Sequence, residues 1–181
     1  MNIELKSLSD RPNDIKKAKL LYRNAFPREE RPPFRLLSSR AAKGKADFLG
    51  IYDGEKWVGF FYVINYADLS YLYFFAIDEA ERGNGYGHAA LKELLSSYPQ
   101  RRIFLAVEPI DEKADNNQDR IRRKRFYHEC GFEELNLKLR EANVVYDLLG
   151  IGSAPTKEEH GKMMDIYLGK LLRHFITMKI L

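Results

Sequence analysis

The chain has 181 residues, enough for one compact domain with an additional helix and too few for a second hydrophobic core. Hydrophobic residues make up 45% of it and charged residues 31%, a globular composition that excludes disorder, collagen-like repeats and coiled coil. The 30 Lys and Arg against 26 Asp and Glu give a net charge of +4, which suits an anionic small molecule such as a nucleotide or coenzyme and is weak evidence for nucleic acid.

The first predicted elements are a short strand and two helices. Apolar residues alternate with polar ones over residues 3–8, which predicts a strand. Over residues 15–26 they recur every three or four positions, which predicts a helix that ends at Pro27, because proline cannot continue a helix interior. Residues 34–42 are expected to form a second short helix.

Three predicted strands follow. Residues 48–52 and 56–65 flank Asp53-Gly54, a strong hairpin turn. Residues 70–77 are nearly all apolar, which is typical of a strand buried on both faces, so this strand is expected at the centre of a sheet.

The second half of the chain alternates helices and strands. A helix over residues 91–98 follows a glycine-rich turn, and residues 103–107 form a buried strand. A basic helix then ends at Cys130-Gly131, where glycine is common just past a helix end. The predicted terminal strand pair is 132–139 with 144–149.

The tail, residues 153–181, is predicted to form one more helix. A capping box begins at Thr156, and residues 163–175 carry apolar residues at helical spacing. The whole order predicts an α/β (α+β) fold with a mixed central sheet of six or seven strands flanked by helices. We expect one domain over residues 1–152 and an amphipathic helix over 153–181 that packs on the domain or on a partner subunit, in a monomer or homodimer.

Cysteine, histidine and hydropathy patterns limit the remaining classes. The single Cys130 cannot form an internal disulfide, and four scattered histidines predict no metal site. The longest apolar stretch, 58–64, is too short for a membrane span, and no basic-then-apolar leader is seen. We therefore expect a cytoplasmic protein without a membrane or nucleic-acid partner.

The turn between the central strand and its helix is the most informative segment. Gly83, Gly85 and Gly87 stand at every second position, where the backbone can adopt positive φ and approach a ligand closely. The unpaired N–H groups that begin a helix favour anions, so the turn predicts a pyrophosphate cradle. No Gly-Lys-Ser/Thr follows, and His88 stands where dinucleotide and protein-kinase loops need glycine. The alternative is that the glycines serve tight turns only.

A pair of motifs resembles one family. Residues 82–87, Arg-Gly-Asn-Gly-Tyr-Gly, resemble the acyl-CoA signature of the GNAT N-acyltransferases, Arg or Gln followed by x-x-Gly-x-Gly/Ala. Residues 126–132 resemble the family's second signature, Tyr-x-x-x-Gly-Phe, and one strand and one helix lie between the two, as in the family. The resemblance covers residues 3–149.

The resemblance implies an acetyl-CoA or other acyl-CoA cosubstrate and no metal. The pantetheine arm would run beside Ala76 and Ile77, and a backbone N–H near Ile77 would receive the thioester carbonyl. The pyrophosphate would bind the main-chain amides of the turn, which are those of Arg82, Gly83, Asn84, Gly85, Tyr86, Gly87 and His88.

The resemblance also implies an amine acceptor, which is a small molecule or a peptide amino terminus. Two proton transfers are needed, because the amine must lose a proton before it attacks and the departing thiolate must gain one. Tyr127 occupies the general-acid position, and Glu108, at the end of a strand, is the candidate base. Glu29 and Glu30 would recognise a cationic substrate. Alternatives stay open, because Tyr127 can be a packing aromatic and Glu108 an exposed carboxylate. A non-catalytic acyl-CoA sensor is the second hypothesis, and Tyr127 favours the enzyme.

The basic helix departs from the family pattern. Arg120 and Arg123 stand where many members carry asparagine and alanine, which leaves open how the coenzyme arm is contacted. The run 120–125 is interpreted first as a solvated face, next as a contact with coenzyme phosphates, and last as a nucleic-acid patch. Cys130 is interpreted as a packed thiol.

Overall fold

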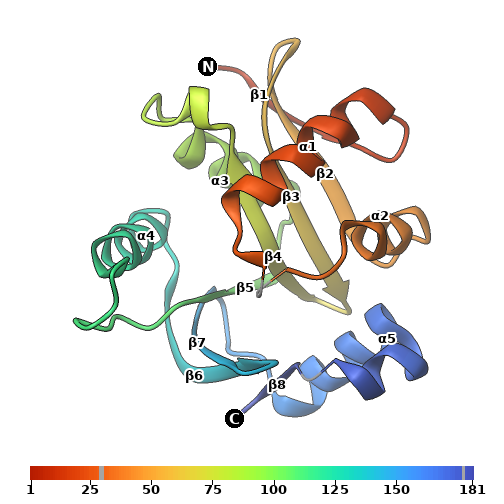
Figure 1. Ribbon diagram of the computed structural model, residues 1–181, viewed down its shortest axis with the longest axis vertical. Helices are drawn as coiled ribbons and strands as arrows, with labels where there is room; N and C mark the ends of the chain where they lie inside the picture. Colours follow the sequence, from red (N-terminus) through yellow and green to blue (C-terminus); the bar gives the residue numbers. More distant parts are fainter. Residues whose placement is uncertain (29–30, 177) are drawn as a thin grey trace. The chain divides into compact units, whose positions relative to one another are not determined.

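The computed structural model describes residues 1–28, 31–176 and 178–181 (Figure 1). Its strands are β1 (Ile3–Ser7), β2 (Asp47–Asp53), β3 (Lys56–Tyr66), β4 (Leu69–Ile77), β5 (Arg102–Val107), β6 (Glu133–Glu141), β7 (Val144–Ile151) and β8 (Met178–Ile180). Its helices are α1 (Pro12–Ala25), α2 (Phe34–Ala42), the 3-10 helix η2 (Glu79–Glu81), α3 (Tyr86–Ser97), α4 (Asn117–Glu129) and α5 (Lys157–Phe175).

The strands form one mixed sheet in the order β1-β2-β3-β4-β5-β7-β6-β8. β4 pairs with β5 in parallel, whereas β2 with β3 and β6 with β7 are antiparallel. The predicted α/β class and the central position of β4 are confirmed. The predicted strand number of six or seven is too low, because eight strands are present in the described residues.

The additional strand corrects the expectation for the tail. The helix ends at Phe175, and β8 pairs with β6 through Leu139↔Ile180 and its neighbours. In β8, buried Met178 and Ile180 flank exposed Lys179, which is the two-residue alternation of a strand. α5 is also interrupted at Gly169, whose φ of +74° is not helical.

The chain divides into two compact units, which are described separately below. The first contains Met1–Ile64 and Tyr73–Pro99, and the second contains Asn65–Leu72 and Gln100–Leu181. The two units share β4, whose first residues belong to the second unit. The predicted division after residue 152 stays a prediction.

Aromatic side chains fill the core of the first unit. Tyr22 of α1 packs edge to face against Phe74 of β4, with ring centroids 5.0 Å apart. Tyr62 of β3 donates to the carbonyl of Leu37 at 2.9 Å and thereby ties α2 to the sheet. A Cβ at Gly59 would lie 2.3 Å from the carbonyl oxygen of Ala76, so this glycine allows β3 and the end of β4 to approach closely.

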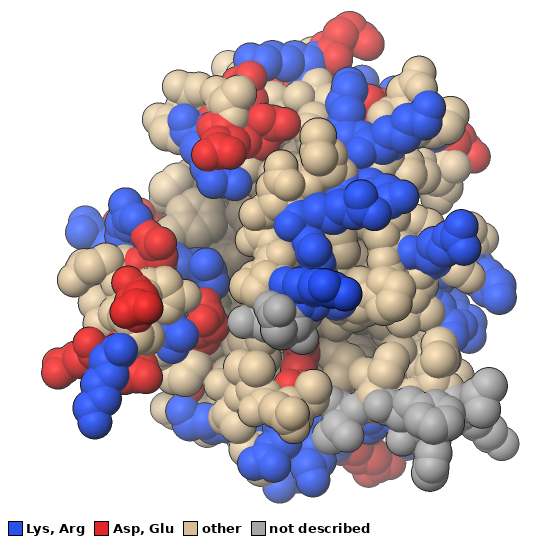
Figure 2. Space-filling view, in the orientation of Figure 1, with Lys and Arg blue, Asp and Glu red and all other residues tan. Residues whose placement is uncertain are grey.

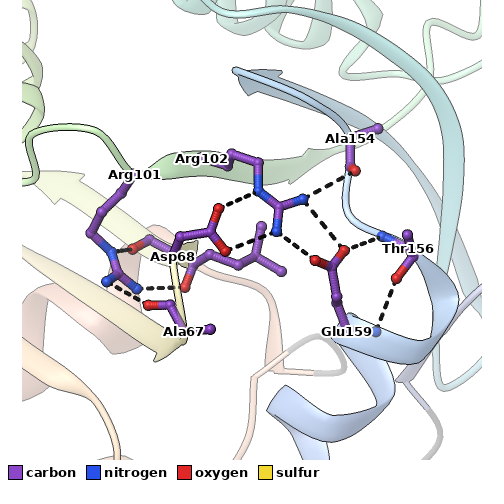
Figure 3. A network of polar contacts seen from close by, with 9 residues as sticks. Ala67, Asp68, Arg101, Arg102, Ala154, Thr156 and Glu159 are labelled. Atoms are coloured by element: carbon purple, nitrogen blue, oxygen red, sulfur yellow. Dashed lines mark hydrogen bonds and ion pairs between the residues drawn. The ribbon is translucent and has the colours of Figure 1, made fainter.

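An arginine network organises the second unit (Figure 3). The Arg102 guanidinium donates to Asp68 at 2.8 and 3.0 Å and to Glu159 of α5 at 2.5 Å. Glu159 also closes the predicted capping box, since it accepts from the Thr156 amide at 2.8 Å. These hydrogen bonds, with that of Arg102 first, lower the pKa of Glu159 to about 2. The network therefore fixes the start of α5 beside β5.

The predicted apolar face of α5 is buried in its first part, whereas Leu172 is only partly buried and the side chains of Leu171 and Phe175 lie outside the described ones. Its described buried residues are Met163, Met164, Tyr167 and Leu168. His160 lies on the same helix, is 1% exposed, and sits 6.5 Å from the Tyr71 ring and 6.2 Å from the Phe104 ring. Burial lowers the pKa of His160 to about 4, so the imidazole is neutral near pH 7.

Candidate functional site

The turn after β4 has the conformation that its glycines allow. Gly83 and Gly85 both have a φ of +81°, and Gly85 is the residue that precedes α3. A Cβ at either position would meet nothing within 4 Å, so glycine is required by the backbone conformation rather than by lack of space. Gly87 instead lies inside the first turn of α3.

Among the predicted binding amides, that of Arg82 already donates to the carbonyl of Glu79 at 3.3 Å, whereas those of residues 83–87 are unpaired in the described structure. The first helical hydrogen bond of α3 runs from Ala89 to the carbonyl of Gly85 at 3.2 Å, and no side chain caps the helix. Within the described parts of the chain, the N–H groups of residues 83–87 make no hydrogen bond. The positive end of a helix dipole adds to these donors, so the segment can bind an anion through its main chain.

Side chains hold the turn in place without hydrogen bonding to the amides of residues 83–87. The Arg82 Nε donates to the carbonyl of Ile77 at 3.2 Å. The Tyr86 hydroxyl donates to Asp53 at 3.1 Å, and Lys56 pairs with Glu81 at 2.7 Å. Burial, followed by the Asp53 bond, raises the pKa of Tyr86, which keeps this phenol protonated. The turn is thereby tied to the β2–β3 hairpin.

A polar cleft of about 540 Å³ lies beside Arg82 in the first unit. Its walls come from α1, β3 and the residues after β4, which are Lys17, Leu20, Leu21, Asn24, Trp57, Asp78, Glu79, Glu81 and Arg82. The buried Trp57 indole N–H has no hydrogen-bond partner among the described residues. The sequence analysis missed this cleft because an aromatic residue within an apolar strand is typical of core.

Ala76 and Ile77 end the strand that leads into the turn. The parallel pairing of β4 with β5 covers Leu69–Tyr71 and Arg102–Phe104, so both residues lie beyond these paired positions. Glu29 and Glu30, the predicted acceptor-binding carboxylates, lie outside the described residues.

Tyr127 belongs to the second unit and is buried, with 9% of its surface exposed. Its ring packs against Phe126 at 5.2 Å and Phe132 at 5.7 Å, between ring centroids. Burial raises the pKa of Tyr127 to about 12, and Arg123 opposes this shift. The Tyr127 hydroxyl makes no hydrogen bond to any residue that the structure describes. Tyr127 is therefore protonated near pH 7, and its hydroxyl donates no hydrogen bond to a described residue.

Glu108 follows β5 and binds two arginines of α4. Its Oε1 lies 2.8 Å from Arg120 Nη2, and its Oε2 accepts from Arg123 Nη1 at 3.1 Å. Asn116 adds a longer contact of 3.4 Å. The Glu108 side chain is only 13% exposed, so the alternative of an exposed carboxylate at a strand end does not describe it. The two departures from the family pattern, Arg120 and Arg123, are both partners of Glu108.

The rest of the basic run is paired as well. Lys124 lies 2.8 Å from Glu134 and 3.3 Å from Asp147, while Arg125 lies 2.9 Å from Glu129 and Arg122 pairs with Asp119. On the face shown in Figure 2, red and blue side chains lie interspersed over the region of α4. Each cation of the run thus has a carboxylate partner within the second unit. Arg122, Arg123 and Arg125 are exposed and fit the interpretation as a solvated face, whereas Arg120 and Lys124 are only 18% and 16% exposed and do not.

The structure thus brings the predicted residues together in two groups. Residues 76–88 lie in the first unit, and Glu108 and Tyr127 both lie in the second, where Glu108 contacts α4. Cys130 is half-buried beyond the end of α4, and burial raises the pKa of its thiol, as expected of a packed thiol. In the described residues, no group of three metal-ligating side chains is found, and no helix is long and apolar enough to span a membrane.

One family model and several solved structures are similar to this chain. The family model described as "Acetyltransferase (GNAT) family" matches residues 15–132. No curated protein matches the chain. Among solved structures, one from Bacteroides thetaiotaomicron, described as an acetyltransferase of the GNAT family, is 24% identical with a TM-score of 0.70 and covers 93% of this chain and 97% of its own.

Two further solved structures carry more specific descriptions. An aminoglycoside 6'-N-acetyltransferase complexed with coenzyme A is 18% identical with a TM-score of 0.63, over 86% of this chain and 99% of its own. The ribosomal-protein-S18-alanine N-acetyltransferase from Escherichia coli is 17% identical with a TM-score of 0.58, over 85% of this chain and 97% of its own. At these identities the likeness shows the fold.

Proposed function

The chain belongs to the acetyltransferase (GNAT) family, and on that premise we propose that it transfers an acetyl group from acetyl-CoA to the amine of a small molecule or of a protein amino terminus. The observation that carries the proposal is the run of unpaired amides over residues 83–87 at the start of α3. These donors suit the diphosphate of a coenzyme, and Arg82 and His88 flank them in the sequence.

The turn and the end of β4 both contribute to the proposed binding. The amides would hold the pyrophosphate, while Ala76 and Ile77, which lie beyond the paired part of β4, would offer main-chain groups to the pantetheine arm. A solved structure with this fold contains coenzyme A, which supports the same cosubstrate here.

The proposed reaction is direct transfer in a ternary complex. The neutral amine nitrogen attacks the thioester carbonyl carbon, a C–N bond forms, and the C–S bond breaks. The amine nitrogen loses one proton to solvent water or, in the alternative considered below, to Glu108, and the departing thiolate of coenzyme A gains one. We assign the second proton to Tyr127, whose phenol is protonated and uncommitted.

The raised pKa of Tyr127 makes proton transfer from this phenol to the thiolate energetically unfavourable. A thiol has a pKa of about 8.5, so transfer from a phenol at about 12 is uphill by roughly 4 to 5 kcal/mol if nothing else stabilises the phenolate. The pKa of about 12 already includes the lowering by Arg123, so without this cation the cost of the proton transfer would be higher.

The role of Glu108 follows from its partners. As a base, it would take up a proton while both of its oxygens accept from guanidinium groups, and proton uptake would weaken both ion pairs. This arrangement supports an anchoring role for α4 better than a base, and the base role remains the alternative that a Glu108 variant tests.

Calorimetric titration tests the binding half of the proposal. Acetyl-CoA should bind the wild-type protein, and Gly85→Ala should weaken binding about tenfold, because alanine at positive φ costs roughly 1 to 2 kcal/mol and moves the amides. Gly44→Ala is the matched control, since Gly44 also has a positive φ and open space but lies far along the sequence from the turn. Equal affinity for all three proteins contradicts the proposed site.

A turnover assay tests the chemistry. Release of free thiol from acetyl-CoA is followed in the presence of a panel of primary amines, and mass spectrometry detects the acetylated product. Product formation with at least one amine supports the transferase. Coenzyme binding without product from any amine or peptide supports the sensor instead.

A further inference from the structure

We propose that Arg123, anchored by Glu108, is a positioning residue that stabilises the charge developing on the Tyr127 phenol as it gives up its proton. This inference rests on the proposed function and specifies how the same site is tuned. It concerns only the second unit, where all three residues lie.

The first support is the placement of Arg123 on α4. Arg123 and Tyr127 are four residues apart in one helix, so their side chains occupy the same helix face, one turn apart. Arg123 is half-exposed, with 48% of its side chain accessible, whereas Tyr127 is buried. The partly exposed cation and the buried phenol are therefore neighbours on one face of α4.

The second support is the anchor. A free arginine side chain at a protein surface would turn towards water, but Arg123 Nη1 is held 3.1 Å from Glu108 Oε2. Glu108 is itself fixed, since its other oxygen binds Arg120, and Arg120 also donates to the carbonyl of Pro109 at 2.9 Å. The Arg123 guanidinium is thus held by Glu108, whose own position is fixed by Arg120.

The third support is the electrostatic setting of the phenol. Burial disfavours a phenolate, and the hydroxyl has no described hydrogen-bond donor that would stabilise one. The titratable groups that act on it are Arg123 and Cys130, of which Arg123 favours the phenolate and the Cys130 thiol disfavours it. From β5, Glu108 reaches this group through Arg123, and the neighbouring rings of Phe126 and Phe132 carry no charge. Arg123 is therefore the cation that lowers the cost of proton release.

The experiment replaces Tyr127 with a fluorinated tyrosine, whose more acidic phenol can be titrated by fluorine NMR as a single resonance. It is measured with Arg123 intact, with Arg123→Gln, with Arg123→Lys, and with the matched control Arg122→Gln. Arg122 is 77% exposed and pairs with Asp119, so its removal deletes the same charge from the same helix at another position.

The expected result is a raised phenol pKa in Arg123→Gln, by about one unit because Arg123 is partly screened by water. Arg123→Lys should restore most of the shift, and Arg122→Gln should leave the pKa unchanged. An equal phenol pKa in the Arg123→Gln and Arg122→Gln proteins overturns the proposal, whether or not an acceptor amine is known.

Turnover provides a second readout that a structural role would not move. With native tyrosine at position 127, Arg123→Gln should lower kcat about tenfold at unchanged KM for acetyl-CoA. The fluorinated tyrosine should recover most of that loss, because its acidity replaces the missing cation. Loss of kcat without recovery overturns the proposal in favour of a purely structural ion pair.

Failure of the proposed function can be distinguished from failure of the inference about Arg123. If Tyr127→Phe keeps full kcat, the assignment of the acid is wrong, and the inference about Arg123 falls with it. If Tyr127→Phe loses activity while Arg123→Gln does not, the acid stands and the inference about Arg123 alone is overturned.

Discussion

The turn of the first unit and the α4 region of the second contribute to the proposed chemistry by different means. In the turn, the functional groups are main-chain amides, and the side chains of Tyr86, Asp53 and Glu81 only brace them. Around α4, the functional groups are side chains: Tyr127 is packed between aromatic rings, and Arg123 is held by Glu108, which is distant in sequence. The first region is therefore sensitive to glycine replacement, and the second to loss of charge.

Tyr127→Phe, a change in the α4 region, should cause the largest loss of activity. We expect kcat to fall about a hundredfold, the lower end for loss of a general acid, because the thiolate must then leave without a proton. The affinity for acetyl-CoA, measured by calorimetry, should stay unchanged, because Tyr127 has no part in the turn. A parallel loss of coenzyme affinity would contradict the separation of roles.

Gly59→Ala should disturb the first region alone. The new Cβ would lie 2.3 Å from the Ala76 carbonyl and 3.1 Å from the Ile77 Cα, so the end of β4 must move. We expect a loss of about 2 kcal/mol in the free energy of unfolding, measured with denaturant, and weaker coenzyme binding.

A matched glycine in the second unit should respond in the opposite direction. Gly161 lies inside α5, and a Cβ there meets nothing within 4 Å, so Gly161→Ala should stabilise the protein by about 0.5 to 1 kcal/mol. Destabilisation of both variants to the same extent would contradict the close approach of β3 and β4 as the cause.

The Glu108→Gln variant distinguishes two roles of Glu108, an anchor for Arg123 and a general base. If Glu108 anchors Arg123, we expect kcat to fall only several-fold, and the acid limb of its pH profile should keep its shape. If Glu108 is the base, kcat should fall by about a hundredfold or more and that limb should disappear. Steady-state rates between pH 5 and 9 distinguish the two.

The smallest expected effect is a pH dependence of stability in the second unit. The His160 pKa is about 4 in the folded protein and about 6.5 in the unfolded chain, so the unfolded state binds the extra proton between these values. Stability should be fully present above pH 6.5 and should decline as the pH falls towards 4. In His160→Gln, this part of the pH dependence of the melting temperature should vanish, and its persistence would contradict the assignment.

Local patterns in the sequence were sufficient for most elements. The capping box at Thr156 and the apolar spacing of α5 are confirmed, because both depend on residues within a few positions of each other. β8 was missed because its three residues continue an apolar tail, and only pairing with the distant β6 makes them a strand. The turn glycines were found for the same reason as the helices, since a positive φ is a local property.

Long-range partners could not be predicted. From the sequence, Arg120 and Arg123 were departures from the family pattern, and Glu108 was a candidate base or an exposed carboxylate. Their ion pairs require β5 and α4 to meet, which no local pattern encodes. The same holds for Arg102, whose partners Asp68 and Glu159 lie far apart in the chain.

The most direct test of the central claim is an amide NMR titration with acetyl-CoA. The account predicts that the largest shifts of N–H resonances fall on residues 83–87, with little change at Gly44 and Gly54, which share the positive φ. Saturable binding that leaves the resonances of residues 83–87 unmoved, or no binding at millimolar coenzyme, would contradict it.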